Sequence, residues 1–332
     1  MEVFIILLSP IFAIISSFFI VSTIRFLDVI EKEPLKTIFF AFVAGIISTF
    51  LTLILQTLFP TPATIISSLG NFSDSTFYNL QVVFDAPIIE EFIKLFCLFI
   101  LYSFFKKEFH SLTDFIVYSC IVATGFQFVE NLIYLFGTLN SENPIYDWTA
   151  IVNSRLITSG YMHLLWTGWS GLGLWILKQK NSKDYPSIFF FCLIAISLHA
   201  LNNLASILEL PFLYDIIRSF SLAGFISLLG ISIIRDVKIF NEFARELYLL
   251  NSFNKDQILI IKELEDPIIN IFAKYKWSWR IFKYYNKPSF NRNVYNDFSF
   301  CALSYSDDFS EGNPQIKKNY LTKALSLIST IS

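Results

Sequence analysis

Charged residues are scarce in this chain. Asp, Glu, Lys and Arg make up 16% of its 332 residues, whereas a soluble domain averages about 25%. Apolar residues make up 54%, and phenylalanine alone supplies 38 residues, more than the 25 lysines and arginines together. This composition argues against an ordinary soluble domain and indicates a chain surrounded largely by lipid. The net charge of −2 gives no support to a nucleic-acid binder.

Cysteines are also few. Three of the four, Cys97, Cys120 and Cys192, fall inside apolar runs, and Cys301 lies in a more polar tail. No two of them have the spacing of a metal knuckle or a redox pair. We therefore predict free thiols that fill space.

Long apolar runs, in contrast, are abundant. A spanning helix needs about 20 mostly apolar residues. The first run lacks the basic start of a cleavable signal and is too long for one, so we expect a retained span. The predicted fold class is all-α, a polytopic transmembrane helix bundle of about seven spans. These spans are 3–26, 36–59, 80–105, 114–137, 155–178, 187–208 and 212–234.

Basic residues are distributed unevenly among the connecting segments. The turns after the first, third and fifth spans are basic, whereas the loops 60–79 and 138–154 contain no Lys or Arg. Because basic loops stay cytoplasmic, we expect the N-terminus outside and the tail from Arg235 onward inside. The basic residues of the inner turns are Arg25, Lys32, Lys36, Lys106, Lys107, Lys178, Lys180 and Lys183.

The C-terminal part differs in composition from the rest. We predict a transmembrane domain over 1–235 and a cytoplasmic tail over 236–332. The pattern of the tail predicts a helix at 235–265 and an amphipathic helix at about 315–330. The aromatic and basic stretch 268–285 fits either a helix in the inner headgroup region or part of a small soluble helical module.

Ionisable residues inside a span are costly and tend to mark function. Only three histidines occur, and two of them, His163 and His199, fall deep in the fifth and sixth spans. Carboxylates fall in the third and fourth spans at Glu90, Glu91 and Glu130. Counted from the outer end of each span, these positions lie between about 10 and 15 Å deep at about 1.5 Å per residue. Four different helices therefore bring acids and imidazoles to one level.

Four of these groups have a polar neighbour four residues further along, on the same helix face. The pairs are Glu90 with Lys94, Glu130 with Tyr134, His163 with Thr167, and His199 with Asn203. Lys94 can neutralise one of the two adjacent carboxylates. The spacing predicts that each polar face points toward the other spans.

Several functions fit such a layer. Peptide hydrolysis needs a water, a base and donors for the oxyanion, which carboxylates and imidazoles can supply. Two imidazoles with a carboxylate, here His163, His199 and Glu90, also form a common catalytic zinc shell. Polar residues can instead serve as packing contacts in a non-catalytic membrane scaffold or sensor. An ion-coupled transporter is a third alternative, although the residues form one layer and no file across the membrane.

Five short motifs, in order along the chain, resemble those of the PrsW-type intramembrane proteases. Residues 90–94 resemble the EExxK motif, and residues 125–131 resemble the GFxxxEN motif. Residues 163–168, His-Leu-Leu-Trp-Thr-Gly, resemble the third motif, and residues 199–203 resemble the closing HxxxN. Residues 31–34, Glu-Lys-Glu-Pro, resemble the acidic element of the family. One short motif would be weak, but five in order are specific.

The resemblance, which covers about residues 20–235, implies an intramembrane endopeptidase acting on a membrane-anchored protein within the lipid bilayer. The family is named for site-1 cleavage of an anti-sigma factor, and it is related to the CAAX prenyl endopeptidases and bacteriocin-processing proteins. By this resemblance Glu90 and His163 would activate water, and His199 with Asn203 would stabilise the oxyanion.

The resemblance also implies a role for Glu91, which would orient its neighbour. Supporting residues would be Lys94, Glu130, Asn131 and Thr167. Family members are commonly labelled metalloproteases, so zinc is the candidate cofactor, although these roles also work without a metal.

Overall fold

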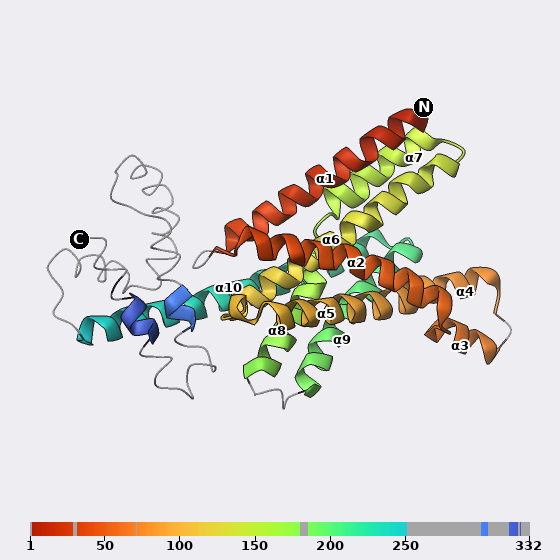
Figure 1. Cartoon of the computed structure of the whole chain (residues 1–332). Coiled ribbons are helices and arrows are strands. Elements are labelled where there is room, and N and C mark those ends of the chain that lie inside the picture. The colour runs from red at the N-terminus through yellow and green to blue at the C-terminus, as the bar shows by residue number, and fades with distance from the viewer. Residues whose placement is uncertain are drawn as a thin grey trace. The chain divides into compact units, whose positions relative to one another are not determined.

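The computed structural model describes residues 2–28, 32–70, 72–179, 185–250, 300–304, 319–324 and 326 (Figure 1). Helices joined by short turns make up this part of the chain, with no β-strand in it, so the predicted all-α class is confirmed. The four cysteines are free and buried, as predicted. Contacts divide the chain into two units, Met1–Leu27 with Glu33–Leu228, and Asp28–Lys32 with Leu229–Ser332.

Each of the seven predicted spans coincides with a long helix. The helices are α1 (Glu2–Leu27), α2 (Leu35–Leu58), α5 (Ala86–Phe104), α6 (Leu112–Gly137), α8 (Met162–Gln179), α9 (Tyr185–Ile207) and α10 (Pro211–Leu250). Five of them, α1, α2, α6, α9 and α10, are long and apolar enough to cross a membrane. The other two are α5, which carries the charged residues Glu90, Glu91 and Lys94, and α8, which carries His163 and is rich in glycine and tryptophan. That α5 and α8 cross the membrane stays a prediction.

Two predicted spans include π-helical segments. The third, predicted from 80, contains α5 from Ala86, which continues without a break from α4 (Asp74–Leu80) and a π-helical segment, Gln81–Asp85, beyond the short α3 (Pro62–Ser68). The fifth was predicted from 155, but α8 begins only at Met162, after α7 (Pro144–Ile151) and a second π-helical segment, Val152–Thr158. A turn at 159–161 causes this break. At Gly160 a Cβ would lie 2.5 Å from the carbonyl oxygen of Leu156, so the turn has room only for glycine.

Proline and capping residues fix where several helices begin. Pro87, Pro144 and Pro211 each lie in the first turn of a helix, where a missing N–H costs nothing. At the start of α6, Ser111 accepts from the backbone N–H of Asp114, and Asp114 accepts from that of Ser111. This reciprocal capping satisfies two of the unpaired N–H groups that every helix start leaves.

Helix α6 is the centre of the membrane unit. Every residue from Leu112 to Gln127 is buried, and α6 packs against α1, α2, α5 and α8. Glycines let its neighbours approach closely. A Cβ on Gly45 of α2 would lie 2.0 Å from the Val122 carbonyl oxygen, and one on Gly171 of α8 would lie 2.5 Å from that of Phe115. Such close backbone packing through small residues is typical of membrane helices.

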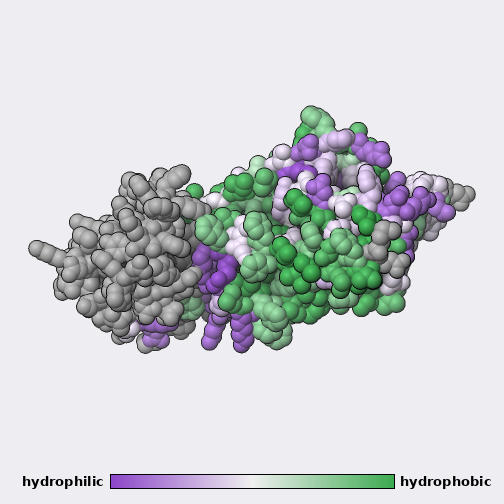
Figure 2. Space-filling model, turned by 90° about the horizontal axis from the view of Figure 1, so that it is seen from above, coloured by the Kyte–Doolittle hydropathy of each residue, from purple (hydrophilic) through white to green (hydrophobic). Residues whose placement is uncertain are grey.

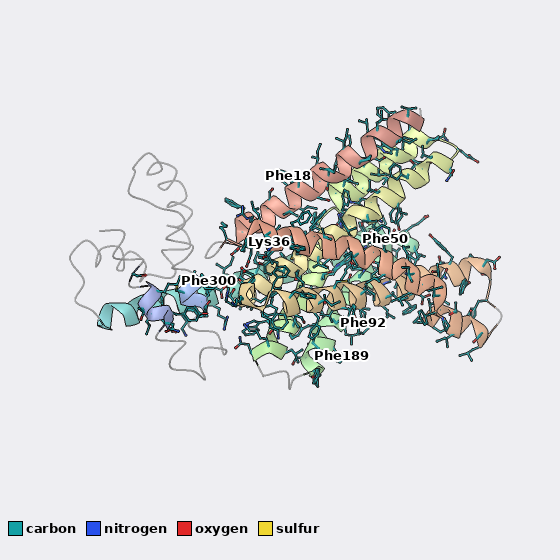
Figure 3. All side chains as sticks on the ribbon, viewed as in Figure 1. Phe18, Lys36, Phe50, Phe92, Phe189 and Phe300 are labelled. Atoms are coloured by element: carbon teal, nitrogen blue, oxygen red, sulfur yellow. The ribbon has the colours of Figure 1, made fainter. Side chains whose placement is uncertain are left out.

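The outer surface of the membrane unit is apolar. Phe18, Phe50, Phe92 and Phe189, labelled in Figure 3, are between 41% and 73% exposed. Apolar residues dominate the middle of the face shown in Figure 2, and hydrophilic ones gather toward its ends. A soluble monomer rarely exposes apolar surface of this extent. Together with the five apolar helices, it identifies a membrane protein, as predicted.

In the second unit the described tail residues include Phe300 and Tyr320, whose ring centroids lie 6.2 Å apart. The helix predicted at 235–265 is described as far as Leu250, where α10 ends. The predicted stretch 268–285 and most of the helix predicted at 315–330 lie outside the described residues.

Candidate active site

The early turns of α5 bring two acids and a lysine together. Lys94 Nζ donates to Glu91 Oε1 at 2.8 Å and to Glu90 Oε2 at 3.4 Å. The spacing of three and four residues places all three side chains on one helix face. Lys94 also lies 3.9 Å above the ring of Phe126 from α6, so its ammonium is enclosed by protein.

Helix α8 adds His163 and Thr167. His163 Nδ1 lies 3.1 Å from Lys94 Nζ. The Thr167 hydroxyl donates to Glu91 Oε2 at 2.8 Å. Thr167 therefore lies on the side of α8 that faces the site, as predicted. Its hydroxyl donates to Glu91, and other groups contact His163.

Helix α9 adds His199, whose Nδ1 lies 3.2 Å from Glu91 Oε1 and 4.0 Å from Glu90 Oε2. Its ring stacks on Trp166, with centroids 4.3 Å apart and planes 19° apart. The stacking contact with Trp166 and the contact with the Glu91 carboxylate together fix the orientation of the His199 ring.

Asn203, one turn further along α9, lies elsewhere. Its side-chain N–H group donates to the Val82 carbonyl oxygen at 2.9 Å. Val82 belongs to the π-helical segment that leads into α5. This hydrogen bond therefore joins α9 to the π-helical segment that precedes α5.

Glu130 of α6 approaches His163 from the opposite side. Its Oε2 atom lies 2.8 Å from His163 Nε2 and 2.6 Å from a terminal nitrogen of Arg155. Asn131, the next residue, accepts from Arg155 Nε at 3.4 Å. Because a carboxylate can only accept, this geometry favours a proton on Nε2 and leaves the Nδ1 lone pair facing the cluster.

Exposure differs across the site. The side chains of Glu91 and Lys94 are fully buried, whereas those of Glu90, Glu130 and Arg155 are 10%, 17% and 25% exposed. The part of the cluster around Glu91 and Lys94, here called the sealed side, is therefore the more deeply buried. The part around Glu90 and Glu130, here called the open side, retains some exposed side-chain surface.

The four central groups are close enough to act on one molecule. Ligand atoms of Glu90, Glu91, His163 and His199 all lie within 4.8 Å of one another, and all four residues are buried. Two groups that each bond the same water at about 2.8 Å can be about 5.6 Å apart. The groups predicted to share a water can therefore do so.

The same donors fit a divalent metal by their chemistry. Two imidazoles and a carboxylate suit zinc, and a metal-ligating histidine usually directs its other ring nitrogen to a carboxylate, as His163 does to Glu130. The Lys94 ammonium, which lies between Glu91 and His163, is directed at the Nδ1 lone pair of His163 and so competes with a metal for that donor.

Three contributors were not predicted from the sequence: Arg155, Trp166 and Gln127. The Gln127 amide donates to the Gly160 carbonyl oxygen at 2.7 Å and so holds the turn before α8. A signal existed for Arg155, because it is the lone basic residue at the edge of a loop without Lys or Arg. Trp166 and Gln127 sit inside motif-bearing segments and carry no signal of their own.

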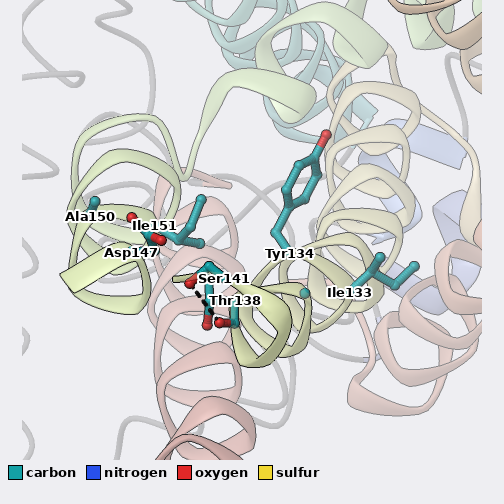
Figure 4. A pocket seen from close by; sticks show the side chains of 8 residues that line it. Ile133, Tyr134, Thr138, Ser141, Asp147, Ala150 and Ile151 are labelled. Atoms are coloured by element: carbon teal, nitrogen blue, oxygen red, sulfur yellow. Dashed lines mark hydrogen bonds between the residues drawn. The ribbon is translucent and has the colours of Figure 1, made fainter. Parts of the chain in front are cut away.

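A separate hollow of about 540 Å³ lies between the end of α6 and α7 (Figure 4). None of the four clustered residues lines it, so it is distinct from the buried cluster. Tyr134 lines it and also lies 3.8 Å below the Arg155 guanidinium. The lining residues are Ile133, Tyr134, Gly137, Thr138, Ser141, Asp147, Ala150 and Ile151.

Comparison with known proteins agrees with this geometry. Residues 33–231, more than half of the chain, match the model of a family described as PrsW family intramembrane metalloprotease. No curated protein and no solved structure matches the chain. The matched region contains the three motifs that supply the buried cluster and the motif that supplies Glu130, and the resemblance is confirmed. The chain therefore belongs to the PrsW family of intramembrane metalloproteases, and it is a membrane-embedded peptidase.

Proposed function

We propose that this peptidase cuts a single-pass, membrane-anchored protein near its extracytoplasmic side, using Glu90 and His163 to activate a water. One observation carries the proposal: ligand atoms of Glu90, Glu91, His163 and His199, from three helices, lie within 4.8 Å of one another in a buried site. A positioned base contributes about 10²–10⁴-fold to such a reaction.

The two adjacent glutamates have different roles in this proposal. Glu91 accepts from Lys94 and Thr167 and faces His199, so its oxygens are committed to protein groups. Glu90 has longer contacts, 3.4 Å to Lys94 and 4.0 Å to His199, and its side chain is partly exposed. Glu90 therefore takes the proton of the water, while Glu91 orients the groups around it.

His199 is the proposed oxyanion donor. Its Nδ1 faces Glu91, so the Glu91 carboxylate orients the ring beside the proposed oxyanion. Asn203 is proposed to act indirectly. Its amide donates to the Val82 carbonyl oxygen and so holds the π-helical segment that precedes α5.

Zinc is the metal that this donor set favours, and Glu90, His163 and His199 would hold it. When bound, a zinc ion polarises the scissile carbonyl and makes its water more acidic. We expect about one zinc per purified chain, measured by elemental analysis, and loss of zinc in His199→Ala. A fully active preparation that contains no metal would restrict the mechanism to the glutamate–histidine pair.

A membrane-anchored anti-sigma factor, cut at site 1 to release a transcription factor, is the substrate class proposed from the family resemblance. Residues 1–235 form the proposed protease domain and residues 236–332 its cytoplasmic tail. The proposed topology places the N-terminus outside, because basic residues gather in alternate loops.

Cysteine labelling tests this topology. The four native cysteines are buried, whereas Glu142 and Lys107 are exposed on loops predicted to face opposite sides. An impermeant maleimide added to whole cells should label Glu142→Cys and spare Lys107→Cys. The opposite labelling would overturn the topology.

The proteolytic proposal is tested by comparing membrane proteomes of cells that carry the wild-type protein or Glu90→Gln. A fragment pair from a single-pass protein should be present with the wild type and absent with Glu90→Gln. Glu142→Gln, an exposed acid outside the site, is the matched control and should keep the fragments. Identical fragments in all three strains would reject the assignment.

A further inference from the structure

Arg155 makes a set of contacts that the proposed mechanism does not yet use. It lies in the π-helical segment Val152–Thr158, and its guanidinium reaches three residues of α6. A terminal nitrogen lies 2.6 Å from Glu130 Oε2, Nε donates to Asn131, and the group stacks 3.8 Å over the Tyr134 ring. Extra residues in π-helical segments often occur at functional sites.

The contact with Glu130 leads directly to the reaction centre. The same carboxylate oxygen, Oε2, lies 2.8 Å from His163 Nε2. One oxygen atom therefore lies between a guanidinium and an imidazole. Because a carboxylate can only accept, the Glu130 oxygen favours the proton on Nε2, the same tautomer that the Lys94 ammonium favours from the Nδ1 side.

We infer that Arg155 is a positioning residue that acts on His163 through Glu130. It holds the Glu130 carboxylate so that Nε2 of His163 keeps its proton and Nδ1 presents a lone pair to the cluster. The inference rests on the proposed role of His163. The planar fork of arginine, stacked on Tyr134, suits this task better than a lysine ammonium does.

Arg218 provides a matched control. It donates to the Thr158 carbonyl oxygen and to Ser159 Oγ, so it also binds the end of the π-helical segment. Its guanidinium lies 4.6 Å from the Tyr214 ring centroid, and its described contacts do not include Glu130 or His163. A purely structural role in this segment would be shared by both arginines.

Histidine NMR gives a readout that does not require a substrate. The chain has only three histidines, so ¹⁵N-histidine-labelled protein in nanodiscs gives few signals, and His163→Gln assigns one of them. We expect a single Nε2–H tautomer of His163 in the wild type and in Arg218→Gln. Arg155→Gln should give a mixture of tautomers, and Arg155→Lys a partial return. An unchanged His163 signal in Arg155→Gln would overturn the inference.

Kinetics separate failure of this inference from failure of the proposed function. The substrate is a single-pass membrane reporter whose cleavage depends on Glu90. On this reporter Arg155→Gln should lower kcat about 10–100-fold with little change in KM. Combined with Glu130→Gln, it should add no further loss. Wild-type cleavage by Arg155→Gln beside an inactive His163→Gln refutes the inference alone. An active His163→Gln refutes the proposed function itself.

Discussion

The two sides of the buried cluster are built differently. On the sealed side Glu91 and Lys94 are fully buried, and Thr167 donates to the remaining oxygen of Glu91. On the open side Glu90 and Glu130 are partly exposed, and Glu90 has long contacts with Lys94 and His199. The sealed side pairs opposite charges, whereas the two acids of the open side retain some exposed side-chain surface.

This difference separates stability from chemistry. A buried charge is tolerated only when it is paired and hydrogen-bonded, and removing one partner leaves the other uncompensated. The sealed side meets this condition and so forms a rigid support. The open side keeps an acid and an imidazole available to a reactant. Substitutions on the two sides should therefore have different consequences.

The largest effect on activity is expected on the open side. His163→Gln removes the imidazole that shares the water with Glu90, so cleavage should fall about 10²–10⁴-fold. The thermal unfolding midpoint in detergent should change little, because glutamine can still donate toward Glu130. A reconstituted cleavage assay measures the loss of activity. Turnover close to that of the wild type would contradict the proposed difference between the two sides.

The largest effect on stability is expected on the sealed side. Lys94→Met leaves Glu91 buried without its ion-pair partner, which should cost about 3–5 kcal/mol of unfolding free energy. Lys107→Met, at an exposed lysine, is the matched control and should change nothing measurable. Replacing Glu91 together with Lys94 by methionine should recover part of the loss. Equal midpoints for Lys94→Met and wild type would contradict the account.

A smaller effect is expected from Thr167. Thr167→Val keeps the shape of the side chain but removes the hydrogen bond to Glu91 Oε2, a loss of about 1.5–3 kcal/mol for a bond to a charged group. Thr57→Val is the control, since the exposed Thr57 hydroxyl only donates to carbonyls of its own helix. Chemical denaturation in detergent compares the two, and similar stabilities would argue against a rigid sealed side.

Much of the site could be predicted from local spacing. The contact of Lys94 with Glu90 follows from their separation of four residues, and the meeting of Glu91 with His199 follows from their similar depth. The apolar runs predicted the position of every long helix. The physical reason is that lipid forces polar groups inward, so the sequence pattern carries the information directly. The catalytic roles of these residues stay predictions.

Other features depended on contacts that a sequence pattern does not show. The late start of α8 follows from a turn at Gly160 within an apolar stretch, held by Gln127 from another helix. The reach of Asn203 to Val82 depends on a π-helical register that spacing rules for α-helices do not anticipate. Arg155 meets Glu130 only because α7 and its π-helical extension run back alongside α6.

The most direct test compares Glu90→Gln with Glu91→Gln, two identical changes at neighbouring positions on opposite sides of the cluster. We predict that neither variant cleaves a reconstituted single-pass substrate. Only Glu91→Gln should lower the unfolding midpoint, because only Glu91 has committed oxygens on the sealed side. An equal fall in both midpoints, or cleavage by Glu90→Gln, would contradict the division between support and chemistry.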